Sequence, residues 1–168
     1  LTQGILDASA GGFTVNNPST GAITFVSNQS WIVGTLTRAI SAGASNYSFP
    51  IGSSATENLA IILNETAAGA GTVSAVASPS AGGKTASGAL VTPFTSQAIS
   101  LTSSVNLTSV AFNADRFTSS FNAFSALAEA PAIGGAYTAL PTASVAANNI
   151  QTTPAATTLA AGVPKFIA

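Results

Sequence analysis

The stretch "WIVGTLTRAISAGASNYSFPIG", residues 31–52, decides the fold because it has the pattern of two β-strands joined by a turn of small residues. The "SAGAS" turn suggests a hairpin, in which residue 40 would pair with residue 46 and residue 35 with residue 51. In that register one face of the ribbon carries Trp31, Val33, Tyr47, Phe49 and Ile51. We expect this largely aromatic face to be the core.

The opposite face of the expected hairpin carries Ile32, Leu36, Arg38 and Ile40. Three aliphatic side chains beside one cation do not suit a solvated surface, so a second layer should cover them. Two covers are open: another part of the same chain, which domains generally use to bury both faces of a central sheet, or a neighbouring subunit. With either cover, Arg38 is expected to lay its apolar stem over the aliphatics and to direct its guanidinium to carbonyls or a carboxylate at the rim.

Turn signals recur along the rest of the chain at intervals of roughly eight to twelve residues, which is the pattern of an all-β sandwich. Besides residues 30–40 and 46–52, strands are expected at residues 11–15, 21–26, 58–65, 71–78, 88–94, 97–103 and 105–112, with weaker signals at 135–140 and 162–168. Pro50 cannot donate to a ladder, so it predicts a sheet edge or a bulge.

One segment departs from this pattern, since Phe117, Phe121, Phe124 and Ala128 recur at helical spacing. It predicts one minor helix over residues 114–129, with its Phe stripe packed on a sheet. We therefore predict a single domain over residues 1–168, an antiparallel β-sandwich of immunoglobulin-like or jelly-roll type. Extended arms are expected at residues 1–12 and 150–168.

Charged residues make up only 5% of the chain and the net charge is −1, against about 25% charged residues in ordinary soluble proteins. Four basic residues are too few for a nucleic-acid footprint, so no nucleic-acid partner is expected. The chain has no His and no Cys, which excludes the common nucleophile pairs and the usual zinc sites. We predict no enzyme activity, and no catalytic, cofactor-binding or metal-binding residues. No apolar run is long enough for a transmembrane helix, so no membrane span is expected.

A folded chain with so few charges either carries another hydrophilic coat or hides much of its surface in an assembly. Glycans would supply such a coat, and four Asn-x-Ser/Thr sequons make Asn28, Asn46, Asn64 and Asn106 candidate glycosylation sites. The sequence starts at Leu1 without Met, and we expect a mature, exported form whose leader has been cleaved. The expected location is extracellular or at the cell surface.

A resemblance supports this expectation. The pattern Gly34-x-Leu36-x-Arg38, followed by Tyr47-x-Phe49-Pro50-Ile51-Gly52, resembles a recurrent block in large secreted surface proteins of Bacteroidota. The resemblance covers residues 30–78 approximately, and it implies an extracellular β-rich structural or adhesive module. It assigns no chemistry to any residue.

These observations predict an extracellular structural subunit that self-assembles into a filament, sheath or surface layer, with copies of itself as partners. The alternative is an adhesin-like module that binds surface glycans or a protein through exposed loops. Sheet edges with so little charge to protect them are expected to be filled by a strand from a neighbour. Two segments could donate it: residues 1–15, with Gly11-Gly12 as hinge, or residues 157–168, where Pro164 would interrupt a ladder and so favours the N-terminal segment. The candidate assembly interface comprises Leu1, Ile5, Leu6, Ile32, Leu36, Arg38 and Ile40.

Overall fold

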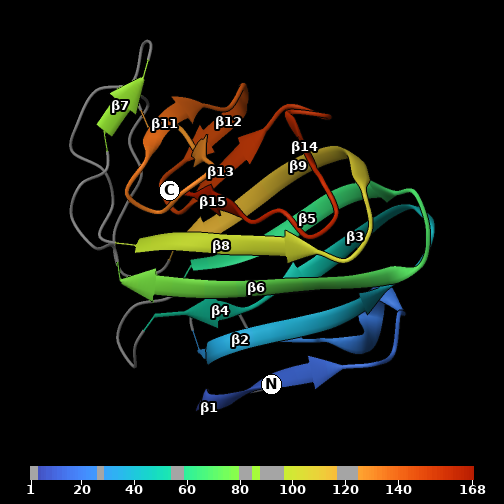
Figure 1. Cartoon of the computed structure of the whole chain (residues 1–168). Helices are drawn as coiled ribbons and strands as arrows, with labels where there is room; N and C mark the ends of the chain where they lie inside the picture. The colour runs from blue at the N-terminus through green and yellow to red at the C-terminus, as the bar shows by residue number, and fades with distance from the viewer. Residues whose placement is uncertain (1–3, 26–28, 54–58, 80–84, 88–96, 117–124) are drawn as a thin grey trace.

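The computed structural model describes residues 4–25, 29–53, 59–79, 85–87, 97–116 and 125–168, and in this part the chain is an all-β sandwich of two packed sheets (Figure 1). The larger sheet runs in the order β1-β2-β6-β8-β15-β10-β11-β7, with β4 also paired to β2. The smaller sheet runs β12-β13-β9-β5-β3, with β14 also paired to β9. The predicted all-β sandwich is confirmed.

The strands of the larger sheet are β1 (Gly4–Val15), β2 (Ser30–Ile40), β4 (Ile51–Gly52), β6 (Gly71–Pro79), β7 (Thr85–Ser87), β8 (Gln97–Ser103), β10 (Ala128–Ala130), β11 (Ala136–Ala139) and β15 (Lys165–Ile167). Those of the smaller sheet are β3 (Gly43–Phe49), β5 (Leu59–Ala67), β9 (Leu107–Arg116), β12 (Thr142–Ala146), β13 (Asn149–Thr152) and β14 (Thr157–Leu159). A single 3-10 turn, η1 (Thr20–Ala22), lies in the crossover between β1 and β2. The chain changes sheet repeatedly, so most strands pair with partners that are distant in the sequence.

The expected hairpin of residues 31–52 is wrong. β2 pairs with β1, β4 and β6 in the larger sheet, whereas β3 pairs with β5 in the smaller one. The turn between β2 and β3 carries the chain from one sheet to the other. Pro50 marks the next change of sheet, since the chain leaves β3 there and returns beside β2, where the Pro50 carbonyl accepts a hydrogen bond from the Ile32 amide at 2.9 Å.

This change of sheet explains the side chains that the hairpin assigned to opposite faces. Both sets lie in the interior: the aliphatic residues of β2 face inward from one sheet, and Tyr47 and Phe49 face inward from the other. Trp31 and Val33, expected in the core, are only half-buried and lie on the outer side of β2. The alternation within each strand was correct, but alternation does not identify the partner strand. The cover for the β2 aliphatics is a second sheet of the same chain.

The core lies between the two sheets and is built from both. Its largest fully buried apolar side chains are Ile32, Leu36, Ile40, Tyr47, Phe49, Ile51, Ile61, Leu63, Ile99 and Phe112. A smaller cluster around Tyr137 is formed by side chains of β8, β10 and β11 together with Ala168. Each large aliphatic or aromatic side chain buried in this way contributes about 1.5–3 kcal/mol, so apolar burial supplies most of the free energy that holds the two sheets together.

The predicted arms and helix are corrected as well. Residues 150–168 are no arm, because β13 and β14 pair with β9, and β15 lies between β8 and β10. Ile150, Leu159 and Ile167 are buried, which explains why this segment docks. Of the predicted helix, residues 114–116 end β9 and residues 128–130 form β10, while residues 117–124 lie outside the described part.

Two of the expected strands either differ in the structure or lie outside its described residues. Residues 21–25 form the end of η1 and an irregular segment in place of a strand. The strand expected at residues 88–94 lies outside the described residues.

Candidate functional site

β1 is the edge strand of the larger sheet and runs parallel to β2 (Figure 1). Its register pairs Ile5 with Trp31 and Phe13 with Leu36. Within the described residues no strand pairs with its other side, so one row of its backbone groups faces away from the sheet. The segment expected to be a free arm is therefore docked on its own domain, at an open edge.

The docking of β1 uses little apolar burial. None of its residues is buried; Leu6, Ala8 and Val15 are half-buried against the core, while Ile5 and Phe13 remain 42% and 41% exposed. The backbone ladder to β2 supplies the remaining attachment. β1 is thus held less firmly than the central strands, and it presents two large apolar side chains to the outside.

The pairing of β1 with β2 is interrupted by a bulge between Ala8 and Phe13. Opposite it stands Gly34, whose φ of +108° lies in the region that favours glycine. A Cβ atom at this position would come within 2.6 Å of the Ala8 carbonyl carbon and oxygen. Only glycine therefore lets β1 pass so close to β2.

The predicted interface residues divide into three groups. Ile5 is exposed and Leu6 is half-buried on β1, and Leu1 lies outside the described residues. The other four, Ile32, Leu36, Arg38 and Ile40, are at most 1% exposed and belong to the interior, so they are corrected: no neighbouring subunit can reach them. Phe13, which the sequence did not single out, joins Ile5 as an exposed apolar residue of the edge.

Arg38 is a buried cation between the two sheets. Its Nη1 donates to the Ser48 carbonyl at 2.8 Å and its Nη2 to the Ser19 carbonyl at 3.0 Å, as expected for a guanidinium that seeks carbonyls. Its central carbon lies 5.0 Å from the Tyr47 ring centroid and 5.9 Å from that of Phe49, within the range of cation–π attraction. Burial lowers the pKa of Arg38 from its ordinary value.

Arg38 and Tyr47 together fasten the start of the crossover segment, residues 16–25, to the body of the domain. The Tyr47 hydroxyl donates to the Pro18 carbonyl at 3.1 Å and accepts from the Ser41 amide at 2.9 Å. With the Arg38 bond to Ser19, these contacts hold the crossover against β3 immediately after β1 ends. These contacts come from β2 and β3, so the crossover does not depend on β1 to stay in place.

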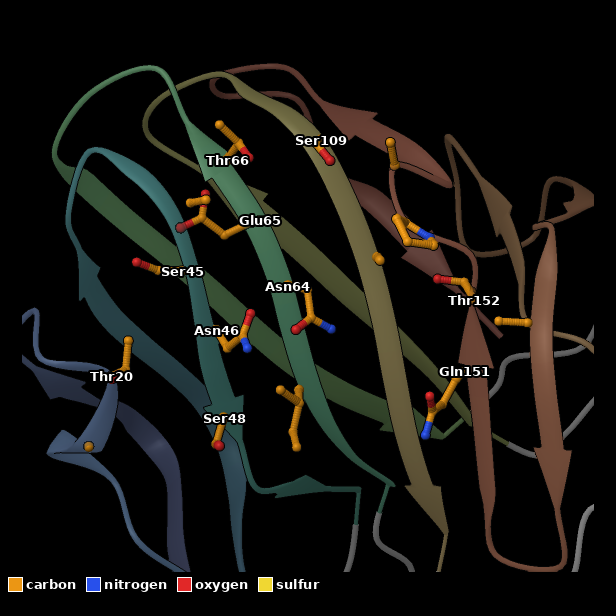
Figure 2. Close-up of a pocket in the computed structure, with 17 residues that line it drawn as sticks. Thr20, Ser45, Asn46, Ser48, Asn64, Glu65, Thr66, Ser109, Gln151 and Thr152 are labelled. Carbon is orange, nitrogen blue, oxygen red and sulfur yellow. The ribbon is translucent and has the colours of Figure 1, made fainter.

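The outer face of the smaller sheet is hollowed into a groove of about 1030 Å³, which we call the polar groove (Figure 2). Asn46 on β3, Asn64 on β5 and Gln151 on β13 present carboxamides to it, and Ser48, Thr66 and Ser109 present hydroxyls. Thr20 of η1 borders the groove beyond β3, and Pro154 borders it beyond β13. Sequence reasoning missed this groove because its strands are far apart in the chain and Asn, Ser and Thr are common throughout.

The candidate glycosylation sites have different surroundings. Asn46 and Asn64 are directly opposite each other on β3 and β5, in the polar groove. The Asn106 Oδ1 accepts a hydrogen bond from the Ala161 amide at 2.9 Å, so its side chain is engaged in the structure. Asn28 lies outside the described residues.

Glu65 is the other buried charged group of this region. It is 4% exposed, and neither of its carboxylate oxygens has a hydrogen-bond partner among the described residues. Burial raises the pKa of Glu65 from 4.5 to about 7. The sequence indicated only that Glu65 stands near the end of a strand. No local pattern revealed that its side chain is buried.

No three His, Cys, Asp or Glu side chains within the described ranges gather in a way that could hold a metal ion. The described part of the chain also contains no helix that is long and apolar enough to cross a membrane. Comparison with known proteins gives no match: no family model, no curated protein and no solved structure aligns significantly with this chain. The resemblance to Bacteroidota surface proteins thus stays a prediction.

Proposed function

We propose that this chain is an extracellular structural subunit that self-assembles into a filament, sheath or surface layer, and that its subunits join through β1. The observation that carries the proposal is the state of β1, an edge strand with no buried side chain and with Ile5 and Phe13 exposed. Natural sheet edges are usually protected by charge. Among its described residues β1 has only Asp7, whose carboxylate already accepts hydrogen bonds from the Ser9 amide at 3.0 Å and the Ser9 hydroxyl at 2.6 Å.

The mode of joining that fits this edge is strand exchange, in which β1 of one copy occupies the place beside β2 of the next copy. The same backbone ladder and the same contacts of Leu6, Ala8 and Val15 would form between copies as within one copy. Because no β1 side chain is fully buried, the strand can leave while uncovering only the part of the core that Leu6, Ala8 and Val15 contact. A chain of such exchanges runs head to tail and does not close on itself, so it grows an open filament.

The hinge for this exchange is expected at Asn16-Asn17, and not at Gly11-Gly12. The two glycines lie inside β1, in the bulged part of its pairing with β2. Pro18 and Ser19 are tied to Tyr47 and Arg38, so the crossover stays on its own body. The short segment between Val15 and Pro18 is then where the strand must swing away.

A disulfide trap tests strand exchange cleanly, because the chain has no cysteine of its own. Thr14 and Thr37 are direct partners on β1 and β2, so a Thr14→Cys/Thr37→Cys variant should cross-link whichever two strands are paired. The variant is refolded at about 1 mM, the range of effective concentration for a short linker, oxidised, and run on a non-reducing gel. We expect a ladder of disulfide-linked oligomers from the material that sediments.

The matched control is Ala39→Cys/Thr72→Cys, which joins β2 to β6 inside one body. It should give a monomer band even from assembled material. If the sedimenting material gives only a monomer band on the non-reducing gel, all Thr14–Thr37 disulfides lie within one chain and strand exchange is refuted. Edge-to-edge contact through Ile5 and Phe13 would then be the remaining mode of assembly. A chain that stays monomeric under these conditions would refute the assembly role itself.

A further inference from the structure

We infer that the polar groove is a binding site for a neutral carbohydrate chain. This inference concerns the outer face of the smaller sheet and is independent of β1, which belongs to the other sheet. It rests on the arrangement of the side chains across four neighbouring strands, β3, β5, β9 and β13 (Figure 2).

The middle of the groove is lined by short side chains, and polar side chains stand on both sides of it. The groove is lined on β9 by the outward positions Ser109 and Ala111, whose short side chains leave space above this part of the sheet. Asn46 on β3 and Asn64 on β5 lie to one side of β9, and Gln151 on β13 lies to the other side. A chain-like ligand lying over β9 would therefore have carboxamides on both sides.

The polar groups of the groove suit hydroxyl ligands. Each carboxamide offers two donors and one acceptor, and each hydroxyl offers one donor together with acceptor capacity, so adjacent sugar hydroxyls can be paired in either direction. Ile62, Ala111 and Pro154 add small apolar patches between these groups, where the C–H faces of sugar rings can rest. The combination of a few placed polar groups and apolar contact is typical of small-molecule sites.

The charges in the groove favour a neutral ligand. Its described lining contains no Lys or Arg, so phosphate, sulfate and carboxylate groups would find no counter-charge. Glu65 is the one acidic residue of the lining, and its carboxylate oxygens are buried. An anionic polymer should therefore bind more weakly than a neutral one of the same length.

A peptide is a poorer occupant than a carbohydrate. The backbone of β5, β9 and β13 is paired on both sides within the sheet, so an extended peptide lying on this face could not add to a ladder. Recognition here has to come from side chains alone. Carboxamides and hydroxyls without a deep side-chain pocket match a repeating polyol better than a peptide.

The test is a titration of the isotopically labelled monomer, followed by two-dimensional amide NMR, with maltohexaose, cellohexaose and laminarihexaose as probes. Hexagalacturonate and a neutral hexapeptide serve as comparison ligands. We expect at least one neutral hexasaccharide to shift the amides of β5, β9 and β13 in a saturable way. The sample is first checked by mass spectrometry, and only protein without a covalent glycan on Asn46 and Asn64 is used for the titration.

The variants Asn64→Ala and Gln151→Ala should each weaken this binding about 2- to 10-fold, the cost of losing about one net hydrogen bond. Gln29→Ala is the matched control, because Gln29 is exposed beside β2 on the other sheet and should leave binding unchanged. The amide spectra of the variants report whether each remains folded. The inference is overturned if none of the neutral hexasaccharides shifts the groove amides, if only the acidic sugar or the peptide does, or if both groove variants bind as tightly as the unmodified chain.

Discussion

Replacing Glu65 by glutamine is expected to stabilise the protein at alkaline pH. Glu65 is 4% exposed, its carboxylate has no hydrogen-bond partner in the described part of the chain, and its pKa is raised from 4.5 to about 7 because burial disfavours the charged form. This change of pKa corresponds to about 3 kcal/mol of folding free energy, at about 1.4 kcal/mol for each pH unit. That free energy is lost when the buried group ionises.

The sign follows from proton binding. Between pH 4.5 and about pH 7 the folded protein holds a proton on Glu65 that the unfolded chain has released. The free energy of unfolding should therefore fall as the pH rises through this window and then level off. Glutamine has nearly the same shape and cannot ionise, so Glu65→Gln should keep its stability across the window and exceed the unmodified protein by about 3 kcal/mol at pH 8.

Urea unfolding at pH 5, 6, 7 and 8, followed by the fluorescence of the single tryptophan, Trp31, measures this difference. The control is Asp7→Asn, because the hydrogen bonds from Ser9 lower the pKa of Asp7, and its neutralisation should bring no gain at pH 8. If Glu65→Gln loses stability with rising pH as steeply as the unmodified protein, or is less stable at pH 8, the account of a buried ionising carboxylate is wrong.

Two further substitutions test the attachment of the crossover and of β1. Arg38→Met keeps much of the side-chain volume but leaves the Ser48 and Ser19 carbonyls without their buried donor. It should lower the free energy of unfolding by about 3 kcal/mol or more, at the upper end of what single changes do. An unchanged urea midpoint would contradict the role assigned to Arg38. Gly34→Ala places a Cβ atom against the Ala8 backbone at a positive φ. Amide hydrogen exchange should then show loss of protection in β1, while β6 and β8 stay protected. Retained protection in β1 would show that β1 does not need glycine at position 34.

The sequence predicted individual strands well and their partners badly. Residues 30–40 and 97–103 were expected as strands and are β2 and β8 to the residue, because alternation and β-branching are local signals. The turn of small residues after β2 serves a hairpin and a change of sheet equally well, and only the packing of the whole chain decides between them. The same limit applies to residues 114–116, where non-local pairing with β5 extends β9 into a segment of helical pattern.

The candidate site could be predicted only in part. Ile5 and the N-terminal strand were proposed from the scarcity of charge, and the partners of Arg38 were correctly expected to include carbonyls. Its position was wrong, since Arg38 lies in the interior and not at a rim. Glu65 is buried on the same face of β5 as Ile61 and Leu63, and the polar groove depends on which outer positions of four separated strands meet. A single sequence carries no signal for either.

The connection from residue 16 to residue 29 has a consequence for the kinetics of assembly. It keeps β1 close to its own β2, at an effective concentration of about a millimolar, the range for a short linker. At micromolar concentration a free subunit would therefore pair β1 with its own β2 long before it met a neighbour. Growth would need an existing end whose slot beside β2 is vacant, so assembly should show a lag phase that short preformed fragments abolish.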